Sequence, residues 1–363
     1  MDIQAYFKAY LKQYTPYKTY WNYEDGCILK GCIDLYEATG DDTYRQFVLD
    51  YVSRYVAQDG SIPNYEMRQY NIDSINCGKA LYFAFQETGE ERYRTAIEFH
   101  MQRLREHPRC QCGSFWHKQL YPNQIWLDGL YMAQPFYMAY EMKFGGMEKV
   151  GDIVTQFRNV RKYLWDAEKG LNYHAYDEAR EQFWADRETG CSANFWLRST
   201  GWYLMALVDT IGLCTEQLYE HWRALVDIFR ESLSGVLKHQ AEDGLFYQVI
   251  DHPEAEGNYT ETSGSAMIAY ALLKGVRLGL IDPEKYLPIG KRVFEALAET
   301  KLKTEADGVT RLTDICWVAG LGPAKNPQRD GSVAYYLSEP KKSDDSKGVG
   351  PFIMAYSEYL KAE

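Results

Sequence analysis

The chain has 363 residues and a mass of 42.2 kDa, and its composition is 46% hydrophobic, 25% charged and 15% aromatic. These values exclude a disordered chain and indicate a globular protein that buries a large core. The formal net charge of −11 argues against a nucleic-acid partner, because binding a phosphate backbone requires a clustered positive field.

Six strongly apolar segments follow one another along the chain, and each is predicted to be a buried helix because it is apolar nearly all round. They cover residues 26–39, 75–88, 127–144, 198–213, 263–280 and 349–360. The first five are each followed by a predicted amphipathic helix, over residues 43–57, 92–105, 149–165, 216–239 and 284–300. A further amphipathic segment, residues 1–14, is available to cover the sixth.

This alternation predicts an all-α fold, an (α/α)6 barrel of six inner and six outer helices that forms a single domain over residues 1–363. A two-domain helical bundle is the alternative. In a closed barrel, the connections from each outer helix to the next inner helix lie at one rim, together with the amino ends of the inner helices. Asp-Gly turns before alternating aromatics predict short strand-like extensions in these connections.

Unusual polar residues stand just before or at the start of the inner segments, and a closed barrel brings them to one concave end. They are Glu24, Asp25, Asp73, Asp128, Arg198, Glu261 and Lys347. Asp73 and Asp128 could each be a helix N-cap that accepts backbone N–H groups. Apolar residues flank Asp128, so we expect burial to raise its pKa and leave it protonated near neutral pH, as a general acid must be.

Basic and aromatic side chains also recur near this rim. Arg198 and Trp202 are four residues apart on one helix face, where they could hold a sugar carboxylate or simply pack around an ion pair. His174, between two aromatic residues, could bind substrate or bond only to the backbone. The run that contains His117 and Lys118 could be no more than an exposed loop.

Several motifs are absent from the sequence. No segment approaches the roughly 18 apolar residues of a membrane span, and residues 1–14 lack the features of a signal peptide. The eight cysteines include no Cys-x-x-Cys pair and no cysteine–histidine set with zinc spacing. Nucleotide-binding, serine-hydrolase and zinc-protease motifs are missing as well. We therefore expect a cytoplasmic protein with reduced thiols, no metal site and no cofactor.

Several of these segments, in order over essentially the whole chain, resemble glycoside hydrolase family 105, the unsaturated rhamnogalacturonyl hydrolases. The motifs are Asn71-Ile72-Asp73, Phe115-Trp116-His117-Lys118, Trp126-Leu127-Asp128-Gly129-Leu130-Tyr131-Met132, Leu171-Asn172-Tyr173-His174, Phe195-Trp196-Leu197-Arg198 with Gly201-Trp202, Glu261-Thr262-Ser263-Gly264 and Gly348-Val349-Gly350-Pro351-Phe352. The run around Asp128 is the most specific of them. Arg198-Ser199-Thr200-Gly201 departs from the family, where Arg-Gly-Asn-Gly is more frequent, which puts the local hydrogen bonding in doubt.

The resemblance implies the (α/α)6 barrel and a set of site residues. It makes Asp128 the catalytic acid/base and Asp73 the second active-site carboxylate. The substrate-binding residues that it implies are His117, Lys118, Trp126, His174, Arg198 and Trp202, and Tyr23 completes our predicted set.

The activity implied by the resemblance is release of the terminal 4,5-unsaturated galacturonate from lyase-generated rhamnogalacturonan disaccharides or oligosaccharides. The enol ether is protonated at C4 and hydrated at C5, without metal or organic cofactor. One alternative is an unsaturated glucuronyl hydrolase acting on oligosaccharides from glycosaminoglycan or ulvan. A second is a sugar 2-epimerase, which would need paired histidines at the rim, where the sequence predicts none. A third is a helical-repeat binding scaffold.

Overall fold

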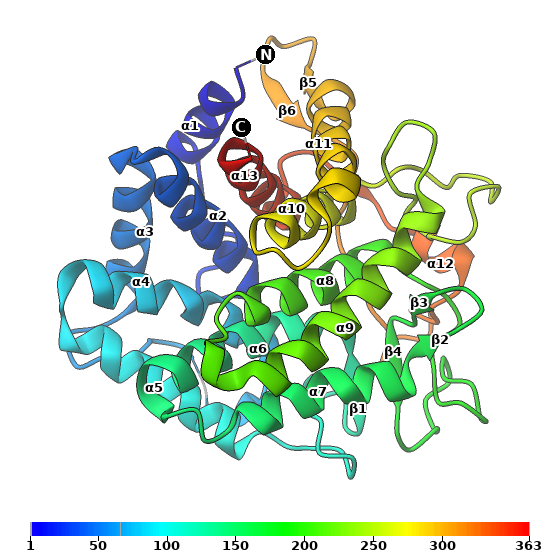
Figure 1. The fold of residues 1–363 in the computed structure, drawn as a ribbon, viewed down its shortest axis with the longest axis horizontal. Helices are drawn as coiled ribbons and strands as arrows, with labels where there is room; N and C mark the ends of the chain where they lie inside the picture. Colours follow the sequence, from blue (N-terminus) through cyan, green and yellow to red (C-terminus); the bar gives the residue numbers. More distant parts are fainter. Residues whose placement is uncertain (1, 66, 363) are drawn as a thin grey trace.

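The computed structural model describes residues 2–65 and 67–362, whose main helices form an inner and an outer layer (Figure 1). The inner layer consists of α2 (Tyr23–Thr39), η2 (Ile72–Gly78) continuing into α4 (Lys79–Thr88), α6 (Leu127–Tyr140), α8 (Leu197–Ile211), α10 (Thr262–Arg277) and α13 (Ser346–Lys361). The outer layer consists of α1 (Ile3–Lys12), α3 (Asp42–Tyr55), α5 (Glu91–Glu106), α7 (Val150–Tyr163), α9 (Tyr219–Val236) and α11 (Pro283–Thr300). This arrangement confirms the predicted (α/α)6 barrel.

The two layers differ in which side chains they bury. In α6, every residue except Asp128 is buried, as expected of a helix with neighbours on all sides. In α3, by contrast, Tyr44, Val48, Tyr51 and Val52 are buried at helical spacing, and the opposite face is exposed. Burial of the apolar stripe against the inner layer therefore holds each outer helix in place.

The inner layer closes on itself because α13 packs against both α10 and α2, which brings the last inner helix beside the first (Figure 1). Two glycines allow this closure at the amino ends. A Cβ on Gly350 would lie 2.6 Å from the carbonyl oxygen of Cys27, and one on Gly26 would lie 2.9 Å from the Cα of Cys77. No side chain fits at either position, so backbones of adjacent inner helices touch there.

Short antiparallel strand pairs fill the connections at the same rim. Two of them are hairpins closed by the predicted turns at Gly170 and Gly308, and two join segments that are distant in the sequence. The pairs are β1 (Gln124–Trp126) with β4 (Ala175–Asp177), β2 (Trp165–Asp166) with β3 (Leu171–Asn172), β5 (Leu302–Thr304) with β6 (Thr310–Leu312), and β7 (Ile315–Cys316) with β8 (Lys341–Lys342). A short helix, α12 (Val333–Ser338), lies within the last long connection. These strand pairs fix the positions of side chains that the helices alone would not place.

The structure differs from prediction at two inner helices. The segment predicted to begin as α-helix at residue 75 opens instead with the 3-10 turns of η2, because Asn71 accepts the backbone N–H of Asp73 and starts the helix early. The third inner helix ends at Tyr140 and continues as a π-helical turn over residues 141–145. Among the described residues, no helix is long and apolar enough to cross a membrane.

Candidate active site

A cavity of 210 Å³ opens at the amino ends of the inner helices. Its walls come from the segment before α2, from η2, from the loop that precedes β1, from the start of α6 and from residues 318–329. Six of the nine predicted site residues line it: Tyr23, Asp73, His117, Lys118, Trp126 and Asp128. The fold thus brings side chains together that are more than a hundred residues apart in the sequence.

Asp128 lies in the first turn of α6 with 14% of its side chain exposed. Strand β1 pairs with β4 so that Trp126 is opposite Ala175, and this register places His174 next to Asp128. The Nε2 atom of His174 lies 3.3 Å from Oδ2 of Asp128, and its Nδ1 lies 2.7 Å from the hydroxyl of Tyr336 on α12. His174 is fully buried and is absent from the cavity wall, so it acts on the cavity through Asp128.

The pKa of Asp128 corrects our expectation that burial would keep this residue protonated. Burial does raise the pKa, but the adjacent His174 and then the charge of His117 lower it by more, and the net shift is downward. The sequence could not show that two imidazoles flank the carboxylate. In the absence of substrate, Asp128 is therefore ionised at neutral pH.

Asp73 is the second carboxylate of the cavity, with 11% of its side chain exposed. The ammonium of Lys118 lies 2.5 Å from Oδ2 of Asp73, and Nε2 of His117 lies 3.7 Å from Oδ1. Burial lowers the pKa of Lys118, but the charge of Asp73 raises it by more, so the lysine stays protonated. The pair is held in place because the backbone N–H of Ile72 donates to the carbonyl of His117.

Three stacked rings form one wall of the cavity. His117 lies 4.3 Å from Trp126, ring centre to ring centre, with only 10° between their planes, and Tyr121 lies 4.8 Å from the same indole. Burial lowers the pKa of His117 to about 4, so this imidazole is neutral at pH 7. Flat aromatic walls beside carboxylates are typical of sites that bind sugar rings.

Charged residues of the cavity are paired with two exceptions. Lys18 contacts Glu24 at 2.9 Å, as Lys118 contacts Asp73. Among the described residues, the guanidinium of Arg329 forms no ion pair, and Asp128 contacts no lysine or arginine but lies 3.3 Å from His174. The cavity therefore holds one cation without a carboxylate partner and one carboxylate without a lysine or arginine partner.

Arg329, Lys18 and Tyr121 line the cavity but were missed by the sequence reasoning. The tyrosines that surround Lys18, directly before the first inner helix, are a usable signal for it. Arg329 gives no such signal, because it lies in a long irregular connection and carries no recognisable motif. Glu24, which stood among the rim residues, does line the cavity.

Arg198 and Trp202 lie on α8, outside the cavity wall. Arg198 is 1% exposed, and its guanidinium donates to the carbonyl oxygens of Cys316 and Trp317 at 2.5 and 3.4 Å. It thereby holds the connection that leads into the cavity wall. Trp202 is also 1% exposed and stacks on Tyr131 at 4.9 Å in the main core. The structure does not bring either residue to the cavity surface.

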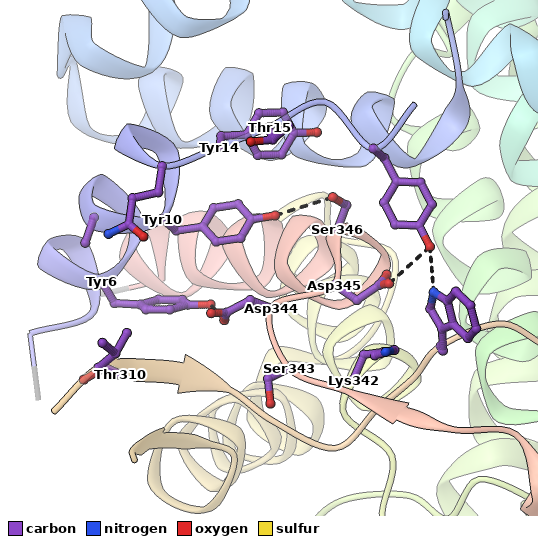
Figure 2. A pocket seen from close by; sticks show the side chains of 15 residues that line it. Tyr6, Tyr10, Tyr14, Thr15, Thr310, Lys342, Ser343, Asp344, Asp345 and Ser346 are labelled. Carbon is purple, nitrogen blue, oxygen red and sulfur yellow. Dashed lines mark hydrogen bonds between the residues drawn. The ribbon is translucent and has the colours of Figure 1, made fainter. Parts of the chain in front are cut away.

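A larger cavity of 400 Å³ lies between α1 and the start of α13 (Figure 2). Tyr6 and Tyr10 extend across it from α1 and bond to Asp344 and Ser346 at 2.6 and 3.4 Å. These polar side chains meet each other's hydrogen-bonding needs, and the bonds hold α1, the first outer helix, against α13, the last inner one. The smaller cavity around Asp128 is therefore the candidate active site, because its polar groups are left partly unpaired.

Comparison with known proteins agrees with this assignment. The sequence pattern of Glycosyl Hydrolase Family 88 matches residues 3–363. A solved family 105 glycoside hydrolase from C. acetobutylicum is 42% identical, superposes with a TM-score of 0.94, and the match covers 99% of each chain. The unsaturated rhamnogalacturonyl hydrolase YesR of Bacillus subtilis is 27% identical over 322 residues, which cover 87% of this chain and 84% of that protein.

A further relative, the unsaturated 3S-rhamnoglycuronyl hydrolase of Formosa agariphila, is 27% identical over 243 residues, or 66% of this chain and 58% of that protein. The chain is therefore a glycoside hydrolase that belongs to the family 88 and family 105 group and has the (α/α)6 barrel of those enzymes.

Proposed function

We propose that the protein removes a terminal 4,5-unsaturated galacturonate from lyase-generated rhamnogalacturonan disaccharides and short oligosaccharides. The observation that carries this proposal is the pairing of charges in the cavity, which leaves Arg329 without an ionic partner among the described residues and gives Asp128 no lysine or arginine partner. A uronate supplies the matching groups, a carboxylate for the guanidinium and a reactive double bond for the acid.

The size of the cavity supports a small terminal unit as the bound group. Its 210 Å³ is below the roughly 300–1,000 Å³ of pockets for drug-sized ligands. A single sugar ring stacked on Trp126 fits this size class, and the remainder of the substrate would extend toward solvent. Cleavage at the end of a chain follows from this geometry.

Asp128 protonates C4 of the unsaturated ring, which forms a C–H bond and leaves an oxocarbenium ion at C5 stabilised by the ring oxygen. Water then adds at C5 and gives its proton back to the Asp128 carboxylate. The resulting hemiketal opens to a ketone at C5, and the hemiacetal left at C1 collapses to an aldehyde with loss of the linked sugar as an alcohol. One water is consumed and Asp128 is regenerated.

The low pKa of Asp128 in the free enzyme is compatible with this role. A bound uronate brings a second negative charge and removes water from the cavity, and both effects raise the pKa of a neighbouring carboxyl group. Substrate binding would therefore help to protonate the acid that attacks it. Asp73, held by Lys118, stabilises the positive charge that develops at C5.

The linked sugar is the finer part of the proposal, and the similarity to YesR, which is named an unsaturated rhamnogalacturonyl hydrolase, supports rhamnose there. The relative named an unsaturated 3S-rhamnoglycuronyl hydrolase makes a different unsaturated uronate, such as a glucuronyl substrate, the second candidate. The structure also brings His117 and His174 together beside Trp126 and Asp128, so the expectation that no histidines gather at the rim is wrong. The comparisons nevertheless favour a hydrolase over an epimerase.

The test is incubation with the unsaturated galacturonyl-rhamnose disaccharide, with loss of the ultraviolet absorbance of the enol ether as the readout. An unsaturated glucuronyl disaccharide and the saturated galacturonyl-rhamnose disaccharide serve as parallel substrates. The proposal expects the fastest absorbance loss with the first and no cleavage of the saturated one. Faster turnover of the glucuronyl substrate would overturn the rhamnogalacturonan part, and no turnover of either unsaturated substrate would overturn the whole.

A further inference from the structure

Two cysteines and a glutamate, none of which lines the cavity, meet where the loop after α5 passes the residue that follows β4. The sulfurs of Cys110 and Cys112 and a carboxylate oxygen of Glu178 all lie within 4.8 Å of one another. Cys110 is buried, whereas Cys112 and Glu178 are half-buried and open to entry from solvent. Among the described residues, this is the one such group of three, and the Cys-x-Cys spacing differs from the zinc patterns that the sequence lacks.

The backbone holds these three groups in position. The carboxylate of Glu178 accepts the backbone N–H groups of Gln111 and Cys112 at 2.7 and 3.0 Å, one at each oxygen. The turn between the cysteines closes because the backbone N–H of Gly113 donates to the carbonyl of Cys110 at 3.0 Å, with Gly113 at a φ of 91°. Each carboxylate oxygen of Glu178 retains a second lone pair for another partner.

The donor set selects the class of ion. Two thiolates and one carboxylate are unsuited to Mg²⁺ or Ca²⁺, which take oxygen ligands, but they suit a borderline-soft ion with tetrahedral geometry. We propose that Cys110, Cys112 and Glu178 form a Zn²⁺ site, with water as the fourth ligand. Binding would release the two thiol protons to solvent as the zinc–sulfur bonds form.

The position of the cluster indicates what the ion would do. The turn with Cys110 and Cys112 leads directly into the run that carries His117 and Lys118, and Glu178 directly follows β4, which begins next to His174. A bound Zn²⁺ would cross-link these two segments on the outer side of the cavity wall. It would add stability there without touching substrate, so its role is structural and independent of the proposed sugar chemistry.

The experiment titrates the reduced, metal-free full chain with Co²⁺, a spectroscopic substitute for Zn²⁺. We expect thiolate-to-cobalt charge-transfer absorption that saturates at one equivalent and disappears when Zn²⁺ is added. A free Zn²⁺ concentration about 100 times the dissociation constant should raise the Tm by roughly 3–6 °C. Glu178→Gln should weaken Co²⁺ binding by more than about tenfold. Mutation of residues that only hydrogen-bond to a metal ligand lowers metal affinity by about that much, and loss of a ligand itself should cost more.

Variants assign the signal to these residues. Cys110→Ser and Cys112→Ser should each abolish the charge-transfer absorption, and Cys112→Ser, at the half-buried position, should leave the fold intact by circular dichroism. Cys214→Ser is the matched control, because Cys214 is also a half-buried thiol but lies at the end of α8. The proposal is overturned if the wild-type protein shows no thiolate-to-cobalt absorption, if the absorption survives in Cys112→Ser, or if Cys214→Ser removes it.

Discussion

His174 approaches Asp128 to 3.3 Å through one ring nitrogen and the hydroxyl of Tyr336 to 2.7 Å through the other. A single imidazole thus links the carboxylate on α6 to α12, which are about two hundred residues apart in the sequence. The pKa of Asp128 is lowered mainly by this neighbour once burial is overcome. The acid strength of the cavity is therefore set by a residue that does not line it.

Replacing Asp128 with asparagine should lower kcat by at least about 10²–10⁴-fold, because it removes the proton donor while keeping the shape of the side chain. The measurement is the rate of enol-ether absorbance loss, with circular dichroism as the control for folding. Near-normal turnover in Asp128→Asn would assign the acid to another residue.

Tyr336→Phe should change the pH profile more than the maximum rate, since Tyr336 positions His174 and does not touch the cavity. A less well oriented His174 lowers the pKa of Asp128 by less. Because Asp128 must be protonated to act, the fall of kcat/KM on the alkaline side should move to higher pH. The comparison is the kcat/KM profile of the two proteins from pH 4 to 8. An unshifted alkaline limb with an equally reduced rate at every pH would contradict a positioning role.

Arg329→Gln should raise KM by roughly 10–100-fold with little change in kcat, because a hydrogen bond between charged groups contributes about 1.5–3 kcal/mol to binding. Arg292→Gln is the matched control, an arginine with 54% of its side chain exposed, on α11. Steady-state kinetics on the unsaturated disaccharide separates the two parameters. Equal KM values in the Arg329 variant and the wild-type enzyme would place the substrate carboxylate elsewhere.

Trp202→Ala should destabilise the protein by about 3–5 kcal/mol, because the indole is fully buried against Tyr131 in the core. Urea unfolding followed by circular dichroism measures this loss. The KM of the folded fraction should stay unchanged, in contrast to Trp126→Ala, which removes the wall of the cavity. A raised KM with unchanged stability would return Trp202 to the substrate-binding set.

His100 is expected to make stability fall in acid. Its Nε2 accepts the Trp21 indole N–H at 3.1 Å, and burial lowers its pKa to about 3. Between pH 6.5 and about 3 the unfolded chain binds a proton that the folded chain does not, so stability present above pH 6.5 is lost as pH falls.

His100→Phe removes this proton uptake, and Trp21 keeps its second acceptor, the carbonyl of Ser74. The free energy of unfolding should then change by about 2 kcal/mol less between pH 7.5 and pH 5 than in the wild type. Urea unfolding at the two pH values gives the difference. An identical pH dependence of stability in the variant would show that His100 titrates normally. The pH dependence that remains in the variant should come from His107 and His117, whose pKa values burial lowers to about 4.

The barrel could be predicted because the inner helices are apolar all round, a property that each segment carries by itself. The position of Asp128 followed from its place at the start of such a helix. The contacts of Arg198 and Trp202 depend on which side of α8 faces the cavity. The contacts of Arg329 depend on the path by which residues 318–329 reach the cavity wall. Arg198 and Trp202 are four apart on a helix that is buried on every side, so periodicity could not tell core from cavity.

The close approaches at Gly26 and Gly350 distinguish the fixed amino ends of the inner helices from the connections that complete the cavity wall. The backbones of adjacent inner helices are in direct contact there. A change of side chain elsewhere therefore cannot alter the spacing of their amino ends. Residues 318–329 and the segment around Lys18, which supply the rest of the wall, are joined to this frame at its edge. Selectivity for the linked sugar can therefore be redesigned by exchanging these connections, while the carboxylates keep their spacing.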